Sequence, residues 1–325
     1  MKEKELNKIL LVVCIFSFLF FVCSFLFSKD GRVFQKAQKT TILNPKYKDE
    51  VRTIMLSRGG LELKLSRYGE FWVEEQGGQM TLCESKLVDS LIGQFSKIRN
   101  VYKIADDYTR SPSYGSDGMT DFSISFFGTG EKSFSQVRLF SSDSITRRVS
   151  FAPSLTGEVY ETEDDFFHLL NLDMNFWAAG EIFFGIADPV EVSFSSSRDG
   201  GVEEKGKITE SDFSFKTVSY GLLKLRHGQI AGKSVAGKNP VLEITVHDGN
   251  ARAARVSVFS DGGEFFLARS VVPSSIFDTD ETSFALLLEN VVYEISGWTY
   301  AQLRQSLGLP SEDGKSAGVS RLQDF

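Results

Sequence analysis

Alternation of apolar and polar residues runs through most of the chain after residue 50 and predicts β-strands. In residues 61–66, leucine occupies every second position and Glu62, Lys64 and Ser66 lie between, which is the period of a strand with one buried face. Gly59 and Gly60 separate this run from the apolar stretch 54–57, so the two runs predict a hairpin. Further strands are predicted at residues 71–73, 122–126, 137–139, 149–151, 190–194, 242–246 and 256–258.

A helical period appears after residue 84. The apolar residues recur at spacings of four, four and three, which places them on one face of a helix: Leu87, Leu91, Phe95 and Ile98. Ser85 is a suitable N-cap, and Lys97 and Arg99 suit the negative end of the helix dipole. A helix is therefore predicted over residues 85–99. Residues 159–170 (VYETEDDFFHLL) predict a strand that runs into a short helix.

The most apolar stretch begins at Ile9, ends at Phe27 and contains no charge, proline or glycine. As a helix it extends roughly 28 Å, close to the thickness of the hydrocarbon core of a bilayer. Lys8 and Lys29 place charges at its two ends. The stretch predicts a retained transmembrane anchor, so the membrane is one expected partner.

Two other interpretations of this stretch are open. A cleaved signal peptide needs small residues before the cut, and Val22 and Ser24 could supply them, but Phe25 and Phe27 continue the apolar run beyond that point. A lipoprotein would be modified at Cys23 or Cys14, yet bulky residues precede Cys23. Both fit the residues less well than an anchor does.

The orientation of the anchor depends on more than the flanking charge. Basic residues occur on both sides of it: Lys2, Lys4 and Lys8 before, and Lys29, Arg32, Lys36 and Lys39 after. The positive-inside rule alone favours a cytoplasmic domain, but it is weak where a long domain follows. We expect a single-pass inner-membrane protein with residues 1–8 in the cytoplasm and the remainder in the periplasm.

Two parts of the soluble region resemble each other. Residues 292–303 (VYEISGWTYAQL) align without a gap to residues 159–170, and residues 223–227 (LKLRH) echo residues 96–100 (SKIRN). The second copy shows only a weak helical pattern where the first has its helix. The predicted fold is α+β, mainly antiparallel β with a few short helices, in two degenerate tandem repeat units. The predicted segments are a tail (1–8), an anchor (9–27), a juxtamembrane linker (28–50), a first unit (51–177), a second unit (178–309) and a disordered tail (310–325).

Composition narrows the class of protein. The net charge of −7 and the pI near 5.2 argue against nucleic acid as a partner. Phenylalanine is abundant, at 29 residues, which suggests an aromatic core. Cys83 is the one cysteine outside the anchor, so an intramolecular disulfide in the soluble region is excluded.

The order of motifs resembles a known family. A strand pair with a tryptophan (GEFWVEE), a helix ending in a basic pair (LIGQFSKIRN), the dipeptide Tyr114-Gly115, alternating strands and then Val-Tyr-Glu with a short helix resemble the DUF4340 family of bacterial, membrane-tethered proteins. The resemblance covers most of residues 50–175. It implies an extracytoplasmic accessory protein, in some members associated with gliding-motility-type ABC transporters, and it implies no active site.

No catalytic or metal-binding motif is found along the chain. The three histidines, His168, His227 and His247, lack metal-ligand spacing, and Ser116 lacks the flanking glycines of a nucleophile elbow. We therefore assign no catalytic, cofactor-binding or metal-binding residue and expect no cofactor.

Several other residues carry a weaker hypothesis. The acidic clusters 161–165 and 278–281 could bind a cation, but acidic residues also stabilise helix starts. Cys83 is expected to be a buried, inert thiol, and the tryptophans are expected to pack in the core rather than line a groove: Trp72, Trp177 and Trp298.

Two functions are consistent with these features. The first is a membrane-anchored interaction protein that binds a membrane partner, for example ABC transporter subunits, through sheet edges or the faces between units. The alternative is an envelope ligand-binding protein or hydrolase with a site between the two units. Enzymatic activity is left open.

Overall fold

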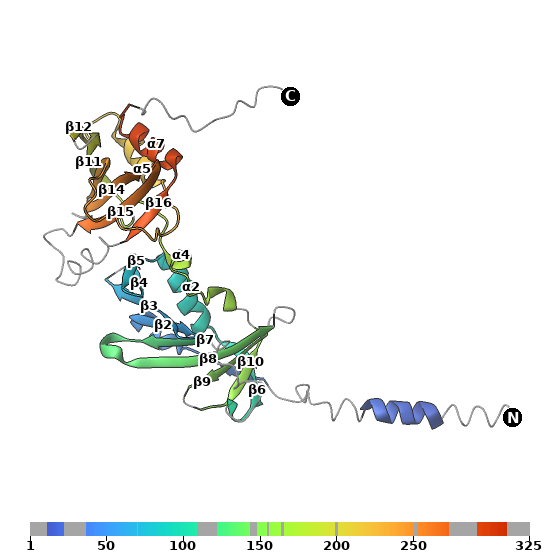
Figure 1. The fold of residues 1–325 in the computed structure, drawn as a ribbon. Coiled ribbons are helices and arrows are strands. Elements are labelled where there is room, and N and C mark those ends of the chain that lie inside the picture. The colour runs from blue at the N-terminus through green and yellow to red at the C-terminus, as the bar shows by residue number, and fades with distance from the viewer. Residues whose placement is uncertain are drawn as a thin grey trace, which may run out of the picture.

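The computed structural model describes residues 12–22, 37–69, 71–108, 122–143, 148–154, 156–163, 166–198, 201–249, 253–272 and 291–310. These residues form two antiparallel sheets with a few short helices, which confirms the predicted α+β class. The sheets belong to two units that follow each other along the chain (Figure 1). Tyr114, Gly115, Ser116, the cluster 278–281 and the tail 311–325 lie outside the described residues.

The first unit contains a ten-stranded sheet in which the hairpin predicted at residues 54–66 is present. Its spatial order is β1-β6-β10-β9-β8-β7-β2-β3-β4-β5. In chain order the strands are β1 (Gln38–Thr40), β2 (Thr53–Arg58), β3 (Leu61–Tyr68), β4 (Phe71–Gln76), β5 (Gln79–Leu82), β6 (Arg99–Ala105), β7 (Phe122–Phe127), β8 (Ser133–Asp143), β9 (Arg148–Pro153) and β10 (Val159–Thr162). Gly59 and Gly60 have positive φ and form the predicted turn between β2 and β3.

One helix, α2 (Ser85–Ser96), packs its apolar face into the core of the first unit. Phe95, for example, lies 5.3 Å from Phe126 of β7 between ring centroids. The predicted start of this helix at residue 85 is confirmed, although its N-cap is one residue earlier than expected, and its predicted end is wrong. Its N-cap is Glu84, and Lys97 is already extended, so Arg99 begins β6 and the side chain of Ile98 is 65% exposed.

The described part of the expected linker, residues 37–50, belongs to the first unit. Strand β1 pairs with β6, and the 3₁₀ helix η2 (Pro45–Glu50) follows it. Leu43, between these elements, is fully buried in the core. The unit therefore begins well before residue 51, because a few apolar side chains anchor a segment that has no regular period.

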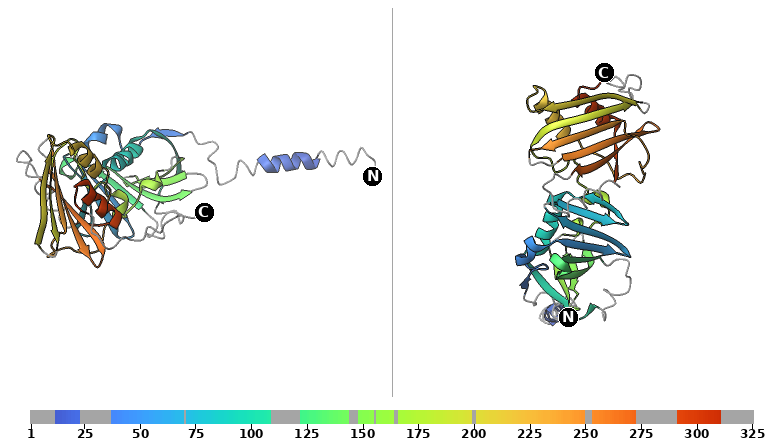
Figure 2. Two further views of the ribbon diagram at one scale, coloured as in Figure 1. Left: turned by 90° about the horizontal axis from the view of Figure 1, so that it is seen from above. Right: turned by 90° about the vertical axis from the view of Figure 1, so that its left-hand side faces the viewer.

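The second unit contains a six-stranded sheet in the order β12-β11-β13-β14-β15-β16. Its strands are β11 (Pro189–Arg198), β12 (Gly201–Thr209), β13 (Leu242–Asp248), β14 (Ala253–Asp261), β15 (Glu264–Val272) and β16 (Val292–Ile295). Two helices, α5 (Phe215–Leu223) and α7 (Gly297–Ser306), cover one face of this sheet (Figure 2). Helix α5 occupies the position at which the sequence shows only a weak helical pattern. The opposite face carries the half-buried Thr245 and the exposed Arg255, together with a small apolar cluster that includes Phe259 and Phe266.

At the N-terminus a helix is described over residues 12–22. Both ends of the predicted anchor, residues 9–11 and 23–27, lie outside the described residues. Within the described ranges, no helix combines the length and the apolar character needed to cross a membrane.

Two leucines on strand β3 provide a test of this core. Leu63 is fully buried, whereas the side chain of Leu61 is 63% exposed. We expect Leu63→Ala to lower the free energy of unfolding by roughly 2 to 5 kcal/mol, because it leaves a cavity. Leu61→Ala is the matched control and should change it by less than about 0.5 kcal/mol. Denaturant unfolding of the full chain in detergent micelles measures both, and equal effects would contradict this description of the core.

Candidate functional site

The two sheets contact each other at a joint, in which the connector between the units, residues 177–186, pairs with the edge strand β5. Cys83 and Ala178 form an antiparallel bridge. The amide of Glu84 donates to the carbonyl of Trp177 at 2.7 Å, and the amide of Ala179 donates to Leu82 at 2.8 Å. The connector therefore pairs with β5 as a short additional strand.

The same connector lies against both faces of the first sheet. Helix α4 (Met174–Trp177) precedes it on the inner face, where Trp177 is fully buried and its indole N–H donates to Asn171. On the outer face the ring of Phe184 packs 5.6 Å from that of Phe71. The connector thus wraps around the β5 edge from one side of the sheet to the other.

The second unit meets the connector through residues 225–231. The amide of His227 donates to Gly180 at 3.0 Å, and that of Ile182 donates to Leu225 at 3.2 Å. The segment 228–231 then pairs with β16, where the amide of Ala231 donates to Val292 at 2.7 Å. Backbone hydrogen bonds therefore run from β5 through the connector to β16, and both facing sheet edges are paired.

Buried polar side chains complete the joint. The hydroxyls of Thr81 in β5 and Tyr293 in β16 hydrogen-bond to each other, and Arg269 in β15 donates to the Tyr293 hydroxyl at 3.0 Å. The other terminal nitrogen of Arg269 donates to the carbonyl of Glu181 in the connector. Thr81, Arg269 and Tyr293 are all buried. The hydroxyl of Tyr293 therefore links the two sheets through Thr81. It also accepts from Arg269, whose guanidinium binds the connector.

His227 packs on this cluster, with its ring 3.8 Å from the ring of Tyr293 between centroids. Its two nitrogens lie 2.7 Å and 2.8 Å from the carbonyl oxygens of Ala179 and Gly228. These acceptors favour the charged ring, but burial and the nearby Arg269 outweigh them and lower the pKa of His227 to about 4. The ring is neutral at neutral pH and donates to one of the two carbonyls.

Glu74 is buried at the joint without hydrogen bonds that would offset its loss of hydration. It lies on β4 directly opposite Thr81, fully buried, and neither carboxylate oxygen has a hydrogen-bond partner. Burial, with a smaller contribution from Asp173, raises the pKa of Glu74 to about 9. Burial and Glu74 also raise the pKa of the Cys83 thiol. At neutral pH both groups are protonated, and the thiol is a poor nucleophile.

The structure brings one of the three histidines, His227, into this joint. His168 is exposed and His247 is half-buried. In the cluster 161–165, Glu161 pairs with Arg148 at 3.3 Å, while Asp164 and Asp165 lie outside the described residues. Trp72 and Trp177 are buried as expected, but the side chain of Trp298 is 67% exposed on α7, so the packing prediction is wrong for it.

Sequence reasoning did not identify Glu74, Thr81, Arg269 or Tyr293 as joint residues. One signal was present for Glu74. It is two residues from Trp72 on the same strand, so a carboxylate occurs at a position whose neighbours face the core. The contacts of Arg269 and Tyr293 depend on the packing of the two units and leave no local pattern.

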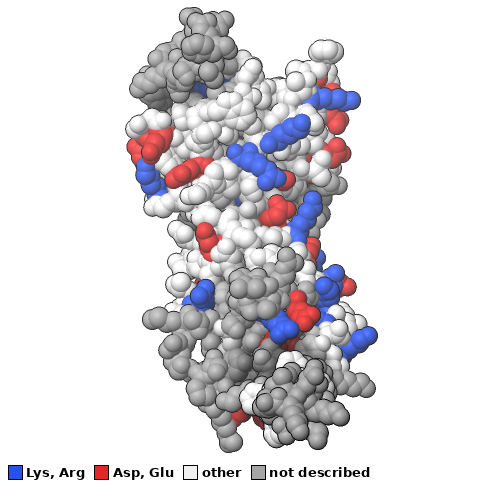
Figure 3. Space-filling model, turned by 90° about the vertical axis from the view of Figure 1, so that its right-hand side faces the viewer, with Lys and Arg blue, Asp and Glu red and all other residues white. Residues whose placement is uncertain are grey.

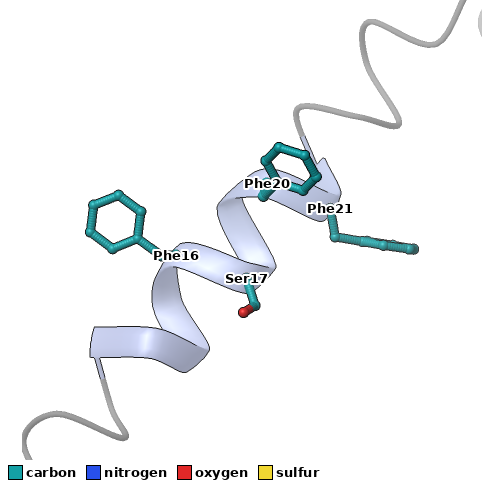
Figure 4. Close-up of a pocket in the computed structure, with 4 residues that line it drawn as sticks. All are labelled: Phe16, Ser17, Phe20 and Phe21. Atoms are coloured by element: carbon teal, nitrogen blue, oxygen red, sulfur yellow. The ribbon is translucent and has the colours of Figure 1, made fainter.

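The face of the molecule in Figure 3 does not concentrate charge of one sign. Lysine or arginine and aspartate or glutamate are interspersed over the described part of the face in Figure 3. A hollow on helix 12–22 is lined by Phe16, Ser17, Phe20 and Phe21, which project from this single helix (Figure 4). In the described ranges, no group of three or more histidine, cysteine, aspartate or glutamate residues could hold a metal ion.

The pH dependence of stability tests the state of Glu74. Because its pKa is higher in the folded chain than in the unfolded chain, the folded state binds more protons between about pH 4.5 and 9, and stability falls as the pH rises through that window. His227 has the opposite effect, and only below pH 6.5. Between about pH 6.5 and 8.5 we expect the unfolding free energy to fall with a limiting slope of about 1.4 kcal/mol per pH unit.

Glu74→Gln should remove this slope, because glutamine does not titrate. Glu75→Gln is the control, since the side chain of Glu75 is 42% exposed and pairs with Lys64 at 3.6 Å. Denaturant titrations of the full chain at several pH values measure the slopes. A slope that persists in Glu74→Gln would show that another group produces it, and the absence of a slope in the unmodified chain would show that Glu74 is ionised in the folded protein.

Removal of one hydroxyl tests the joint itself. Tyr293→Phe leaves Thr81 and Arg269 buried with one partner fewer, which should cost roughly 1 to 3 kcal/mol. It should also make the connector more susceptible to limited proteolysis. Tyr220→Phe is the matched control, because the side chain of Tyr220 is 63% exposed. Equal behaviour of the two variants would contradict a joint held by the Tyr293 hydroxyl.

Comparison with known proteins gives no further assignment: no family model, no curated protein and no solved structure matches this chain. The roles of the joint residues therefore rest on their own geometry.

Proposed function

We propose that this chain is a membrane-anchored, extracytoplasmic interaction protein, held at the inner membrane by residues 9–27 and without catalytic activity. Its partner is a membrane protein, such as a subunit of an ABC-type transport complex. The apolar, uncharged run from Ile9 to Phe27 supports the tether. The resemblance of residues 50–175 to the DUF4340 family supports the accessory role.

The observation that best supports this proposal is the position of the shifted titratable groups in the polar joint. Glu74 and His227, whose pKa values are shifted to about 9 and to about 4, lie where the two units contact each other. Glu74 is fully buried, and His227 contacts Tyr293 and two backbone carbonyls. Both side chains lie within the contact between the two sheets and are not presented to a substrate, so the outer surfaces are left for binding.

We also propose that the two units are a tandem repeat and share one topology. In the first unit, seven neighbouring strands of the sheet have the order β3-β2-β7-β8-β9-β10-β6. In the second unit the six strands have the order β12-β11-β13-β14-β15-β16, and the segment 228–231, which pairs with β16, takes the seventh place, that of β6. Helices α2 and α5 both follow the edge hairpin in the chain. The strands β10 and β16 carry the Val-Tyr-Glu residues that align in the two halves.

The helical side of the second unit is the surface that best suits a partner. Trp298 on α7 and Tyr220 on α5 are exposed there, with 67% and 63% of their side chains accessible. Aromatic side chains are enriched at protein interfaces. The outer edge strand β12 suits pairing less well, because Glu204, Lys205 and Lys207 are exposed on it, and such charges discourage strand addition.

Copurification tests the proposal. After crosslinking in cells and extraction in mild detergent, the full chain should recover a defined membrane partner. Trp298→Ala should lower this recovery by about tenfold if the tryptophan is a binding hot spot. Leu61→Ala, which removes an equally exposed apolar side chain from the first unit, should recover as much partner as the unmodified chain. Repeated recovery of the chain alone would overturn the proposal.

The alternative, a ligand-binding protein or hydrolase with its site between the units, has one observation in its favour. Glu74, Cys83 and His227 gather at the joint with shifted pKa values, as functional groups often do. The alternative requires the joint to open, since Glu74 and Cys83 are fully buried. A small molecule released on denaturation of the purified chain, and absent after Glu74→Gln, would favour it.

A further inference from the structure

A second concentration of charged groups lies in a hollow of the first unit, away from the joint. It forms where the start of β2, the end of β3 and the loop between β7 and β8 meet. The amide of Arg52 donates to Phe127 at 2.8 Å, and the amide of Arg67 donates to Arg52 at 2.8 Å, which draws the three segments together. The hollow is lined by Arg52, Thr53, Arg67, Gly69, Gly128, Thr129, Gly130 and Glu131.

The two arginines are neighbours across the strands. Thr53 pairs with Ser66 in the β2–β3 ladder, so Arg52 and Arg67 oppose each other one position further along. Like charges at directly opposed positions destabilise a sheet. Among the described residues, neither guanidinium has a carboxylate within ion-pair distance. Arg67 donates from Nε to the carbonyl of Gly69 at 3.2 Å, and its guanidinium lies 5.9 Å from the ring of Trp72. An anion between the arginines would relieve their repulsion.

The opposite wall of the hollow is a tight loop with one acidic side chain. Gly128 lies so close to Phe134 that a Cβ would be 2.3 Å from the ring, so no side chain fits at this position of the wall. Gly130 and Glu131 both have positive φ, of 66° and 59°. For Glu131 this conformation is uncommon. The loop places a carboxylate in the same hollow as the two guanidinium groups.

The donors of this hollow match a phosphate better than a carboxylate. Each guanidinium can donate two parallel hydrogen bonds, and the hydroxyl of Thr129 in the loop can add one more donor. A carboxylate has two oxygens to accept them, whereas a phosphate ester has three or four. Glu131 would repel a simple anion, but it would attract a ligand that also carries an ammonium group.

We propose that this hollow binds a zwitterionic phosphate ester of the phosphoethanolamine class. Arg52 and Arg67 hold the phosphate, and Glu131 holds the ammonium group. The same chemistry occurs in a soluble ester and in the headgroup of a phospholipid. The inference does not depend on the proposed function, because it concerns a different surface and needs no protein partner.

Titration calorimetry on the full chain in uncharged detergent micelles tests the site. Phosphoethanolamine should bind saturably and more tightly than glycerol phosphate, and ethanolamine alone should not bind. Arg52→Gln should weaken both esters by about tenfold, as expected for loss of a charge-assisted contact. Glu131→Gln should remove the preference for phosphoethanolamine.

Arg255→Gln is the matched control, because Arg255 is an exposed arginine on the sheet of the second unit. It should leave binding unchanged. Arg52 is exposed as well, so its replacement should not impair folding, and an unchanged unfolding midpoint verifies this. The proposal is overturned if neither ester binds saturably, or if Arg255→Gln weakens binding as much as Arg52→Gln.

A short-chain phosphatidylethanolamine distinguishes the two sources of the ligand. Binding of this diester with an affinity similar to that of phosphoethanolamine assigns the hollow to a lipid headgroup. Binding of the monoester alone assigns it to a soluble ester. Both results support the shared chemistry, provided that Arg52→Gln weakens the binding that is observed.

Discussion

The pairing of the connector with the edge of strand β5 is the interaction on which the arrangement of the two units depends. An unpaired sheet edge exposes a row of amides and carbonyls, which is a liability for any β-protein. Here the connector hydrogen-bonds to Leu82 on one side and to Leu225 and His227 on the other. The segment after His227 in turn covers the edge of β16. One stretch of chain thereby satisfies the edges that face each other and fixes how the sheets meet.

The side chains at this joint favour a defined geometry more than they favour stability. Burying Thr81, Arg269 and Tyr293 removes three polar groups from water, and only well-placed mutual hydrogen bonds offset that loss. Glu74 is buried beside them without any hydrogen bond to its carboxyl group, and it avoids the larger penalty of a buried charge by keeping its proton. A polar joint of this kind is satisfied in one arrangement only, whereas an apolar contact tolerates sliding. The chain therefore gains a specific relation between its sheets.

The difference between the two sheets explains where the joint forms. The hairpin of β4 and β5 extends the first sheet at one end, and the second sheet has no strands in the corresponding place among its described residues. This hairpin supplies Glu74, Thr81 and the edge with which the connector pairs. At the same time it leaves the outer strands, the helical side of the second unit and the arginine-lined hollow of the first unit clear of the joint. These are the surfaces on which we place binding.

Local patterns in the sequence determined the class of fold and most of its strands, because a half-buried strand requires alternation and a tight turn requires glycine. They also indicated the apolar run from Ile9 to Phe27, which depends on composition alone. The end of helix α2 was misplaced, since the apolar period continues to Ile98 while the backbone turns extended at Lys97. Strands β1, β5, β6, β12 and β15 were not predicted. The residues of β5 and β6, for example, do not alternate clearly, and packing against neighbours decides their conformation.

Only the tertiary structure decided the joint and the hollow. Thr81 and Tyr293 lie 212 positions apart in the chain, and neither residue type signals a contact by itself. Arg52 and Arg67 oppose each other because of the register of β2 against β3, which hydrogen bonding sets and local composition does not. A sequence records which side chains are apolar along one element. Which polar groups then share a buried space depends on how separate elements pack, and that is a property of the whole fold.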